Sequence, residues 1–266
     1  MSPEIFRDKL IEPKDHLILA LDGMPWHEAC VILGEIKGQA GAIKIEDMAQ
    51  PLGFGHAIRR CSAYGFPVLA DQKIHRSPVS TLNDVRAIAS QSPLFITVHA
   101  ESSESLISAA RGRGQAIDAL KEYYVSNSKD PDELETIAGL LGVTALTLQG
   151  NRSTKKLLEK AKRIVDAGFV GVVCWPQEVE IIRSNDVTKD TLIIVEGIVQ
   201  RGYKKPHDQK RLRTLASVIK AGADMVIVGQ TILYPPEGMT RVESAQQVVS
   251  EIEAVRYKPK GKKQKE

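Results

Sequence analysis

The amino-acid sequence predicts a single α/β domain with the (β/α)8 architecture, the TIM barrel. Eight short apolar runs recur along the 266 residues, and amphipathic stretches lie between them. Gly65, Gly168 and Gly222 stand where such stretches end, as glycine often does after a helix. Continuous apolar runs are typical of parallel strands buried on both faces. Eight strand–helix units in about 250 residues match the usual size of this barrel.

The predicted strands are short and rich in β-branched residues, which favours strand over helix. A doubly wound open sheet is the alternative fold, but no Gly-x-Gly-x-x-Gly motif follows the first apolar run. The eight runs are Leu17–Leu21, Ala42–Ile45, Pro67–Ala70, Leu94–Val98, Val143–Leu148, Val170–Cys174, Leu192–Val195 and Met225–Val228.

The barrel is expected to occupy residues 1–256, with one insertion near 115–141. That connection is too long for a simple strand–helix unit, and we predict a short extra helix over Asp132–Leu141. Residues 257–266 hold five Lys and one Glu and are expected to form a basic, disordered tail. The net charge of the whole chain is +3, so the barrel itself is close to neutral.

Composition excludes several classes of protein. Only 5% of residues are aromatic, which argues against a stacking platform for nucleic acid. No apolar run is long enough to cross a bilayer, and the N-terminus lacks the pattern of a secretory signal. The three cysteines, Cys30, Cys61 and Cys174, lie far apart and are expected to be buried thiols. We therefore predict a cytoplasmic protein without nucleic-acid or membrane partners.

Charged residues cluster at the predicted carboxyl ends of neighbouring strands, where the active site of such a barrel lies. Asp22 follows the first strand, Lys44 lies in the second, and Asp71 and Lys73 follow the third. Buried charges are costly unless they pair, so this arrangement indicates a functional site; a structural ring of ion pairs is the alternative. Lys73, held protonated by carboxylates, is suited to donate a proton to a developing carbanion. The other polar residues at strand ends are Glu46, Asp47, His99, Glu101, Thr147, Gln149, Gln177, Glu196, Arg201 and Gln230.

These residues resemble a known family of enzymes. The segments Leu19–Asp22 and Asp71–His75, together with Lys44, are similar to the orotidine 5′-phosphate decarboxylase family, whose third strand carries Asp-x-Lys-x-His-Asp in many members. The Asp-x-Lys element is shared with related sugar-phosphate lyases and synthases. Similarity continues in order from about residue 16 to 255, in Thr97–Ala100, Val143–Thr147, Gly171–Glu178, Gly197–Arg211 and Gly222–Gly229.

The resemblance implies decarboxylation of orotidine 5′-phosphate to uridine 5′-phosphate, a step of pyrimidine synthesis, without metal or organic cofactor. It implies that Lys44, Asp71 and Lys73 are catalytic and that Lys73 protonates carbon 6 after CO2 leaves. It also implies a homodimer with its sites at the subunit interface, and a phosphorylated nucleotide as ligand. The substrate-binding residues that it implies are Asp22, Thr147, Arg201, Gly229 and Gln230.

The sequence departs from the family pattern at several positions, of which three bear most directly on the site. Arg76 replaces the second Asp of the motif, and Val199 and Gln230 stand where the family carries phosphate-binding arginines. Reversing the charge at residue 76 is expected either to turn Arg76 away from the site or to reshape what the site binds. Basic residues of the nearby loop provide a substitute anion site or form a solvated charge run; they are Arg201, Lys204 and Lys205.

Two alternative functions remain open from the sequence. One is another phosphosugar decarboxylase or lyase of the superfamily that uses Mg2+, with Asp22, Glu46 and Asp71 as candidate ligands. The other is a non-catalytic or altered-specificity descendant that binds a phosphorylated ligand, as Arg76 and Gln230 would allow.

Overall fold

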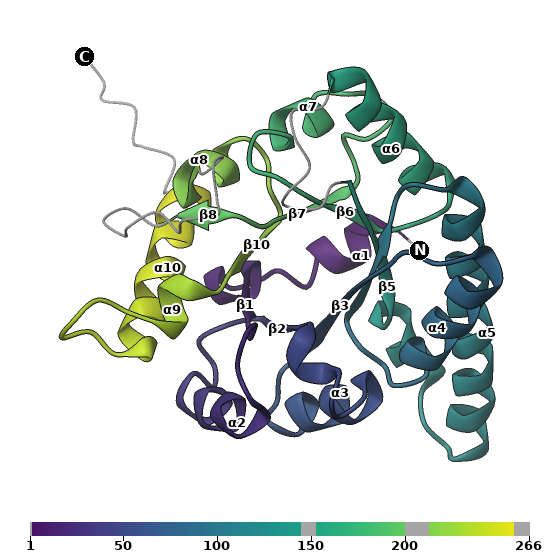
Figure 1. The fold of residues 1–266 in the computed structure, drawn as a ribbon, viewed down its shortest axis with the longest axis horizontal. Helices are drawn as coiled ribbons and strands as arrows, with labels where there is room; N and C mark the ends of the chain where they lie inside the picture. The colour runs from purple at the N-terminus through teal and green to yellow at the C-terminus, as the bar shows by residue number, and fades with distance from the viewer. Residues whose placement is uncertain (1, 145–152, 200–212, 258–266) are drawn as a thin grey trace, which may run out of the picture.

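The computed structural model describes residues 2–144, 153–199 and 213–257. It shows a closed barrel of eight parallel strands with helices around the outside, which confirms the predicted fold class (Figure 1). Around the barrel the strands follow the order β1-β10-β7-β6-β5-β4-β3-β2. Their bounds are β1 Leu17–Ala20, β2 Ala42–Ile45, β3 Val68–Ile74, β4 Phe95–His99, β5 Gly139–Val143, β6 Gly171–Cys174, β7 Leu192–Val195 and β10 Met225–Val228.

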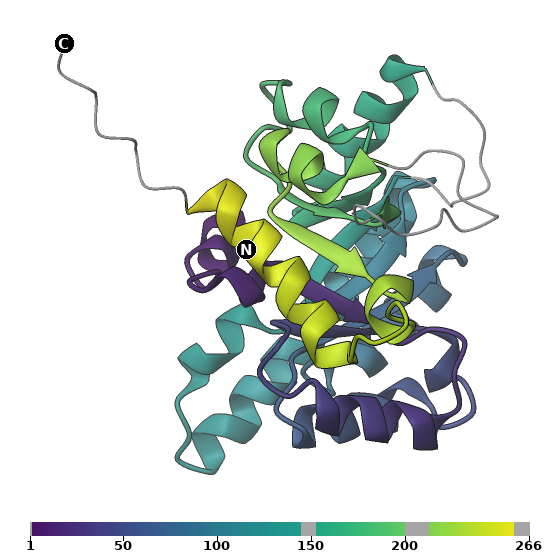
Figure 2. The same ribbon diagram turned by 90° about the vertical axis from the view of Figure 1, so that its left-hand side faces the viewer.

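Helices connect these strands and form the outer layer (Figure 2). Ser77, Ser102, Ser153 and Thr240 begin four of them, each accepting a hydrogen bond from a backbone N–H of the first turn. The α-helices are α1 Pro3–Arg7, α2 Trp26–Glu35, α3 Phe54–Ala63, α4 Pro78–Ala89, α5 Ser103–Ser126, α6 Thr154–Asp166, α7 Val179–Arg183, α8 Leu215–Lys220, α9 Gln230–Leu233 and α10 Arg241–Arg256. Three 3-10 helices are η1 Pro13–His16, η2 Asp47–Ala49 and η3 Pro131–Thr136.

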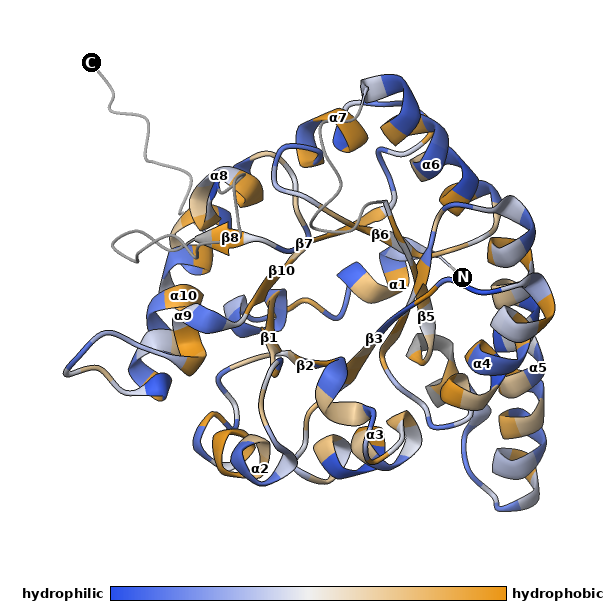
Figure 3. Cartoon of the chain, viewed as in Figure 1, coloured by the Kyte–Doolittle hydropathy of each residue, from blue (hydrophilic) through white to orange (hydrophobic). Residues whose placement is uncertain are grey.

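The barrel strands are largely hydrophobic (Figure 3). They separate two apolar cores, because successive side chains point to opposite faces. The outer core lies between strands and helices, and the inner core fills the barrel. Phe6 of α1 belongs to the inner core, with its ring centroid 5.1 Å from that of Phe95. At Gly139 a Cβ would lie 2.9 Å from both rings, so only glycine fits there. Helix α1 thus closes the amino end of the barrel.

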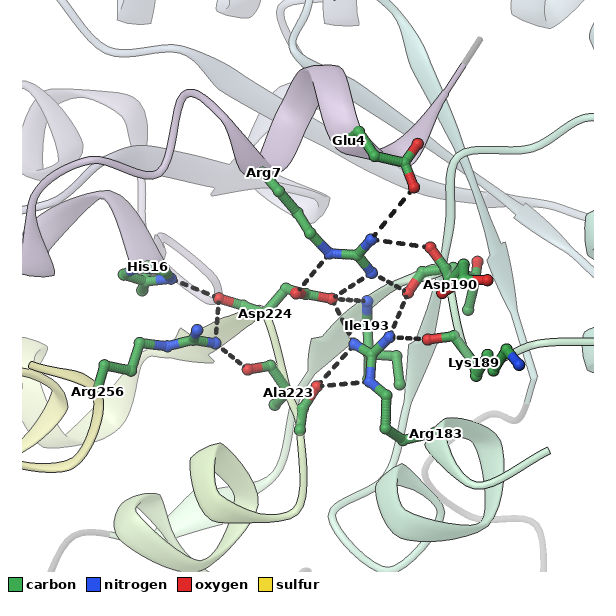
Figure 4. Close-up of polar contacts among 12 residues, drawn as sticks. Glu4, Arg7, His16, Arg183, Lys189, Asp190, Ile193, Ala223, Asp224 and Arg256 are labelled. Carbon is green, nitrogen blue, oxygen red and sulfur yellow. Dashed lines mark hydrogen bonds and ion pairs between the residues drawn. The ribbon is translucent and has the colours of Figure 1, made fainter. Parts of the chain in front are cut away.

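A buried carboxylate, Asp224, organises the polar contacts at this amino end (Figure 4). Arg7 Nε lies 2.9 Å from Asp224 Oδ1, and Arg183 Nη2 lies 2.7 Å from Oδ2. The backbone N–H of Ile193 also donates to Asp224 Oδ2, at 2.8 Å. Further N–H groups of the two arginines donate to the carbonyls of Thr191 and neighbouring residues. The cluster therefore ties α1 and α7 to strands β7 and β10.

Replacing this carboxylate with an amide should weaken the fold. We predict that Asp224→Asn lowers the free energy of unfolding by about 2–4 kcal/mol, because two partly buried guanidinium groups lose their counter-charge. Urea denaturation followed by circular dichroism measures this change. Asp186→Asn is the matched control, since the Asp186 side chain is 97% exposed. A loss below about 0.5 kcal/mol, the usual scale of a surface substitution, would contradict the assignment.

The region between β4 and β5 differs from the prediction. The helix expected over Asp132–Leu141 does not form: the segment holds η3 and the start of β5. Residues 115–126 continue α5, which is 24 residues long.

The fifth strand, predicted over Val143–Leu148, is Gly139–Val143 instead, and residues 145–148 lie outside the described part. Its two glycines lower the apparent strand propensity, yet both are required by close neighbours in the core.

The beginning of the predicted basic tail is anchored to the barrel. The Tyr257 hydroxyl donates to the carbonyl of Ile11 at 3.1 Å and lies 3.1 Å from Nε2 of the buried His16. Residues 258–266, which carry the lysines, lie outside the described part. None of the helices in the described ranges is long and apolar enough to cross a membrane.

Candidate functional site

Charged side chains continue the inner face of the barrel beyond its apolar core. In β2, Ala42 faces the inner core, and Lys44 follows two residues later. In β3, Leu69 faces the inner core, and Asp71 follows two residues later. Because side chains alternate along a strand, both charges point into the barrel near its carboxyl end. This is the end at which barrels of this architecture carry their active sites.

Five residues form one continuous ion-pair network, which we call the Lys–Asp network: Asp22, Lys44, Glu46, Asp71 and Lys73. Lys44 Nζ lies 2.9 Å from Asp22, 3.0 Å from Glu46 and 3.1 Å from Asp71. Lys73 Nζ lies 2.6 Å from Asp71 and 2.8 Å from Glu46. The side chains of Lys44 and Asp71 are only 4% and 2% exposed. The structure thus brings together the four charged residues predicted at the first three strand ends, and adds Glu46.

An irregularity of β3 holds Lys73 in place. The register with β4 shifts between Ala70 and Ile74, so β3 contains extra residues at this point. Lys73 has φ of 46°, a left-handed conformation that is uncommon for a residue other than glycine. Thr97 of β4 stabilises it: the Lys73 N–H donates to Thr97 Oγ1 at 2.8 Å, and this hydroxyl donates to Asp71 Oδ1 at 2.7 Å. One buried hydroxyl therefore positions both members of the central pair.

Removing that hydroxyl should destabilise the site. We predict that Thr97→Val lowers the free energy of unfolding by about 1–3 kcal/mol, because a buried carboxylate oxygen and the N–H of Lys73 lose their partner. Urea denaturation gives the value. Thr97→Ser is the matched control, since it keeps the hydroxyl and should retain most of the stability. Equal losses in the two variants would mean that packing, not the hydrogen bonds, matters at this position.

Mutual attraction fixes the charge states of the central residues. Burial is the largest single effect and would lower the pKa of Lys44 and of Lys73, but the neighbouring carboxylates, Asp71 foremost, together outweigh it and raise both pKa values. Burial alone would raise the pKa of Asp71, but the two ammonium groups outweigh it and leave this pKa below its ordinary value. Both lysines are therefore cations and Asp71 is an anion at neutral pH.

Two further carboxyl groups near the network have raised pKa values. Burial raises the pKa of Asp22, against the attraction of Lys44. Burial, and then repulsion by Asp71, raise the pKa of Glu196 from 4.5 to about 7. Glu196 follows β7 directly and lies two residues after Ile194, a residue of the inner core, so the two are expected on the same face. The site therefore contains a carboxyl group that titrates near neutral pH, a property that is common at functional sites.

The raised pKa of Glu196 predicts how stability depends on pH. Between about pH 4.5 and 7 the folded protein retains a proton that the unfolded chain has lost, so Glu196 lowers the free energy of unfolding as pH rises through this window. Glu196→Gln removes this titration, and the stability of the variant should increase relative to the unmutated protein from pH 4.5 to 8. Urea denaturation at several pH values measures the difference; a difference that is independent of pH would contradict the prediction.

The other predicted site residues have different placements. Arg76 points away from the network and pairs with Asp84 of α4 at 3.0 Å, with 61% of its side chain exposed. Gly229 and the exposed Gln230 lie where β10 passes into α9. Thr147 and Arg201 lie outside the described residues, as do Lys204 and Lys205. Strands β8 (Ile198–Val199) and β9 (Arg213–Thr214) pair in parallel, so the described residues on either side of 200–212 lie together.

The carboxylates of the network are engaged by the ammonium groups of lysines. Within residues 2–144, 153–199 and 213–257, no three His, Cys, Asp or Glu side chains lie close enough together to hold a metal ion. Asp22, Glu46 and Asp71, the candidate Mg2+ ligands, all contact Lys44 Nζ. The donor set therefore does not fit a metal site in this arrangement.

Sequence reasoning underestimated two residues of the site. Thr97 was noticed only for its likeness to a family strand, and Glu46 only as a polar strand end and candidate metal ligand. The alternation of side chains along a strand was the signal that could have placed them on the inner face. Glu46 lies two residues after Lys44, and Thr97 lies two residues after Phe95 of the inner core. The bulge in β3, which no sequence pattern marks, brings Thr97 against Lys73.

A parallel barrel with paired lysines and carboxylates at the carboxyl ends of its strands defines a class: (β/α)8 barrels with a charged candidate site at the end where such barrels carry their active sites. Within that class, residues 15–244 match the Orotidine 5′-phosphate decarboxylase / HUMPS family. The chain belongs to this family.

Individual relatives are similar along most of the chain. Orotidine 5′-phosphate decarboxylase of Anaeromyxobacter sp. (strain K) is 28% identical over 228 residues, covering 85% of this chain and 95% of the relative. The protein of the same name from Methylobacterium sp. (strain 4-46) is 30% identical over 249 residues, covering 91% and 97%. The crystal structure of orotidine 5′-phosphate decarboxylase from Lactobacillus acidophilus superposes with a TM-score of 0.67 at 21% identity, over 89% of this chain and 98% of that one. This structural likeness supports the barrel fold.

Proposed function

We propose that this protein decarboxylates orotidine 5′-phosphate to uridine 5′-phosphate and CO2, as a cytoplasmic step of pyrimidine synthesis, without a metal ion or organic cofactor. The observation that carries the proposal is the pairing of Lys73 Nζ with Asp71 at 2.6 Å, inside a network shared with Lys44. The names of the relatives, at up to 30% identity over most of the chain, support the substrate.

The two lysines are suited to different tasks. Lys44 Nζ contacts three carboxylates, so all three of its N–H groups have partners. Lys73 Nζ contacts two carboxylates within the described residues, which leaves one N–H for a substrate atom. Lys44 therefore acts as a fixed charge that keeps Asp71 ionised, and Lys73 acts as the proton donor.

The proposed reaction follows from these charge states. The Asp71 carboxylate repels the substrate carboxylate beside it. As CO2 departs, the negative charge of the substrate carboxylate moves onto the ring carbon, and this repulsion decreases. The bond between the carboxyl carbon and carbon 6 breaks, and its electron pair remains on carbon 6. The Lys73 ammonium transfers a proton to this pair, becomes a neutral amine and regains a proton from solvent.

Phosphate binding has to rely on groups other than the two arginines of the family pattern, because Val199 and Gln230 stand at those positions. Arg213 is exposed and lies opposite Ile198 in the short β8–β9 pair, at one end of the segment that contains Arg201. Gly229 lies at the end of β10, where a Cβ would lie 3.4 Å from Ala20 Cβ. We propose that Arg201, assisted by the backbone near Gly229 and by Gln230, holds the phosphate, and that Thr147 contacts the nucleotide.

Turnover of orotidine 5′-phosphate by the purified protein tests the proposal. We expect measurable decarboxylation by the loss of substrate absorbance, and a decrease in kcat of at least about 100-fold in Lys73→Ala, because a positioned acid contributes about 10²- to 10⁴-fold. Lys220→Ala is the matched control: Lys220 is exposed on α8, and its loss should leave kcat unchanged. No turnover by the unmutated protein would contradict the proposal.

A second candidate function is binding of a phosphorylated ligand without decarboxylation, or decarboxylation of a different phosphorylated acid. The outward placement of Arg76 and the exposed Gln230 favour it, since both replace residues that the family pattern assigns to the site. If the protein shows no turnover of orotidine 5′-phosphate, calorimetric titration with uridine 5′-phosphate would separate these cases.

Light scattering measures the homodimer that the family resemblance implies.

A further inference from the structure

The Lys–Asp network contains a second carboxylate that bridges its two lysines. Glu46 follows β2, and a single oxygen, Oε2, lies 3.0 Å from Lys44 Nζ and 2.8 Å from Lys73 Nζ. No other contact of the network joins these two ammonium groups except through Asp71, within the residues that the structure describes. Glu46 thus forms the second bridge of a four-membered ring of alternating charges.

The distribution of counter-charges explains why such a bridge is needed. Lys44 also contacts Asp22, but without Glu46 the Lys73 ammonium group would have to share Asp71, its other carboxylate partner among the described residues, with Lys44. Arg76, the residue after His75 in the direction of α4, supplies no compensating anion and instead pairs with Asp84 at the surface. Glu46 neutralises the ring formed by Lys44, Asp71 and Lys73, and Asp22 contacts this ring only through Lys44.

Geometry gives Glu46 a second effect. The Lys73 backbone adopts a left-handed conformation, and its ammonium group is held between Asp71 Oδ2 and Glu46 Oε2. Two fixed acceptors determine where the remaining N–H of Lys73 points. Without Glu46, the ammonium group would be free to rotate about its contact with Asp71, and the proton would no longer be aimed at one carbon atom.

We propose that Glu46 is a positioning residue that supplies, from within the same chain, the second carboxylate of the lysine ring and so orients Lys73 for proton transfer. The proposal deepens the proposed function and rests on it for the identity of the reaction. It also implies that the charge balance of each site is completed without a carboxylate from another copy of the chain.

Glu46→Gln tests this role, because it removes the charge and keeps the shape. We expect kcat for orotidine 5′-phosphate to fall by about 10- to 100-fold with a smaller change in KM, since the substrate still binds but the proton donor is misplaced. Glu46→Asp should recover part of the loss, as it restores the charge on a shorter arm. Glu253→Gln, at an exposed position of α10, is the matched control and should behave as the unmutated protein.

A second measurement does not depend on turnover. In protein labelled with lysine carrying 13C at Cε, the NMR shift of each Cε reports protonation of its Nζ, and Lys73→Ala assigns the Lys73 signal. We expect Glu46→Gln to lower the pKa of Lys73 by about 1 or more, because an adjacent counter-charge is lost. Circular dichroism of each variant confirms folding.

The two measurements separate the possible failures. A Glu46→Gln variant with unchanged or higher kcat would overturn the positioning role. A higher kcat would show that Glu46 occupies space needed by the substrate. If the unmutated protein shows no turnover, the proposed reaction fails, and the NMR titration still decides whether Glu46 controls Lys73. An unchanged Lys73 titration in Glu46→Gln would overturn the inference.

Discussion

The carboxylate of Asp71 lies between two ammonium groups, and the rest of the candidate site is arranged around this interaction. Lys44 and Lys73 both contact Oδ2, while Oδ1 accepts the hydroxyl of Thr97. A carboxylate that is 2% exposed remains ionised only because these three groups compensate its lost hydration. Its charge in turn keeps Lys73 protonated and therefore able to donate.

The barrel carries a polar cluster at each end, and the two have opposite composition. At the amino end, arginines surround the buried carboxylate of Asp224 and donate further N–H groups to backbone carbonyls. At the carboxyl end, carboxylates surround two lysines, and Lys73 keeps one N–H for a ligand. The first cluster is saturated by the fold and stabilises it. Among the described residues, the second leaves one N–H of Lys73 without a carboxylate partner, as the proposed role of Lys73 requires.

Much of this arrangement could be predicted from the sequence, because it depends on strand periodicity. Continuous apolar runs identified the barrel, and the carboxyl ends of the first three strands correctly located Asp22, Lys44, Asp71 and Lys73. The fifth strand was misplaced because Gly139 and Gly142 resemble a loop unless their neighbours are known.

Other features of the site depend on contacts between strands and therefore could not be read from one strand at a time. The left-handed backbone at Lys73 and its bond to Thr97 arise from the register shift between β3 and β4. The outward turn of Arg76 was one of two outcomes expected from its charge, and the structure shows it paired with Asp84. Glu46 then provides the negative charge that residue 76 lacks.

The central claim is that Lys73 delivers a proton to the ring carbon from which CO2 departs. A crystal structure of the protein with uridine 5′-phosphate tests it most directly. The account predicts that carbon 6 of the base lies about 3–3.5 Å from Lys73 Nζ, the separation expected for reacting atoms, with Asp71 beside the position vacated by the carboxylate. A nucleotide bound elsewhere, or bound with carbon 6 turned away from Lys73, would contradict it.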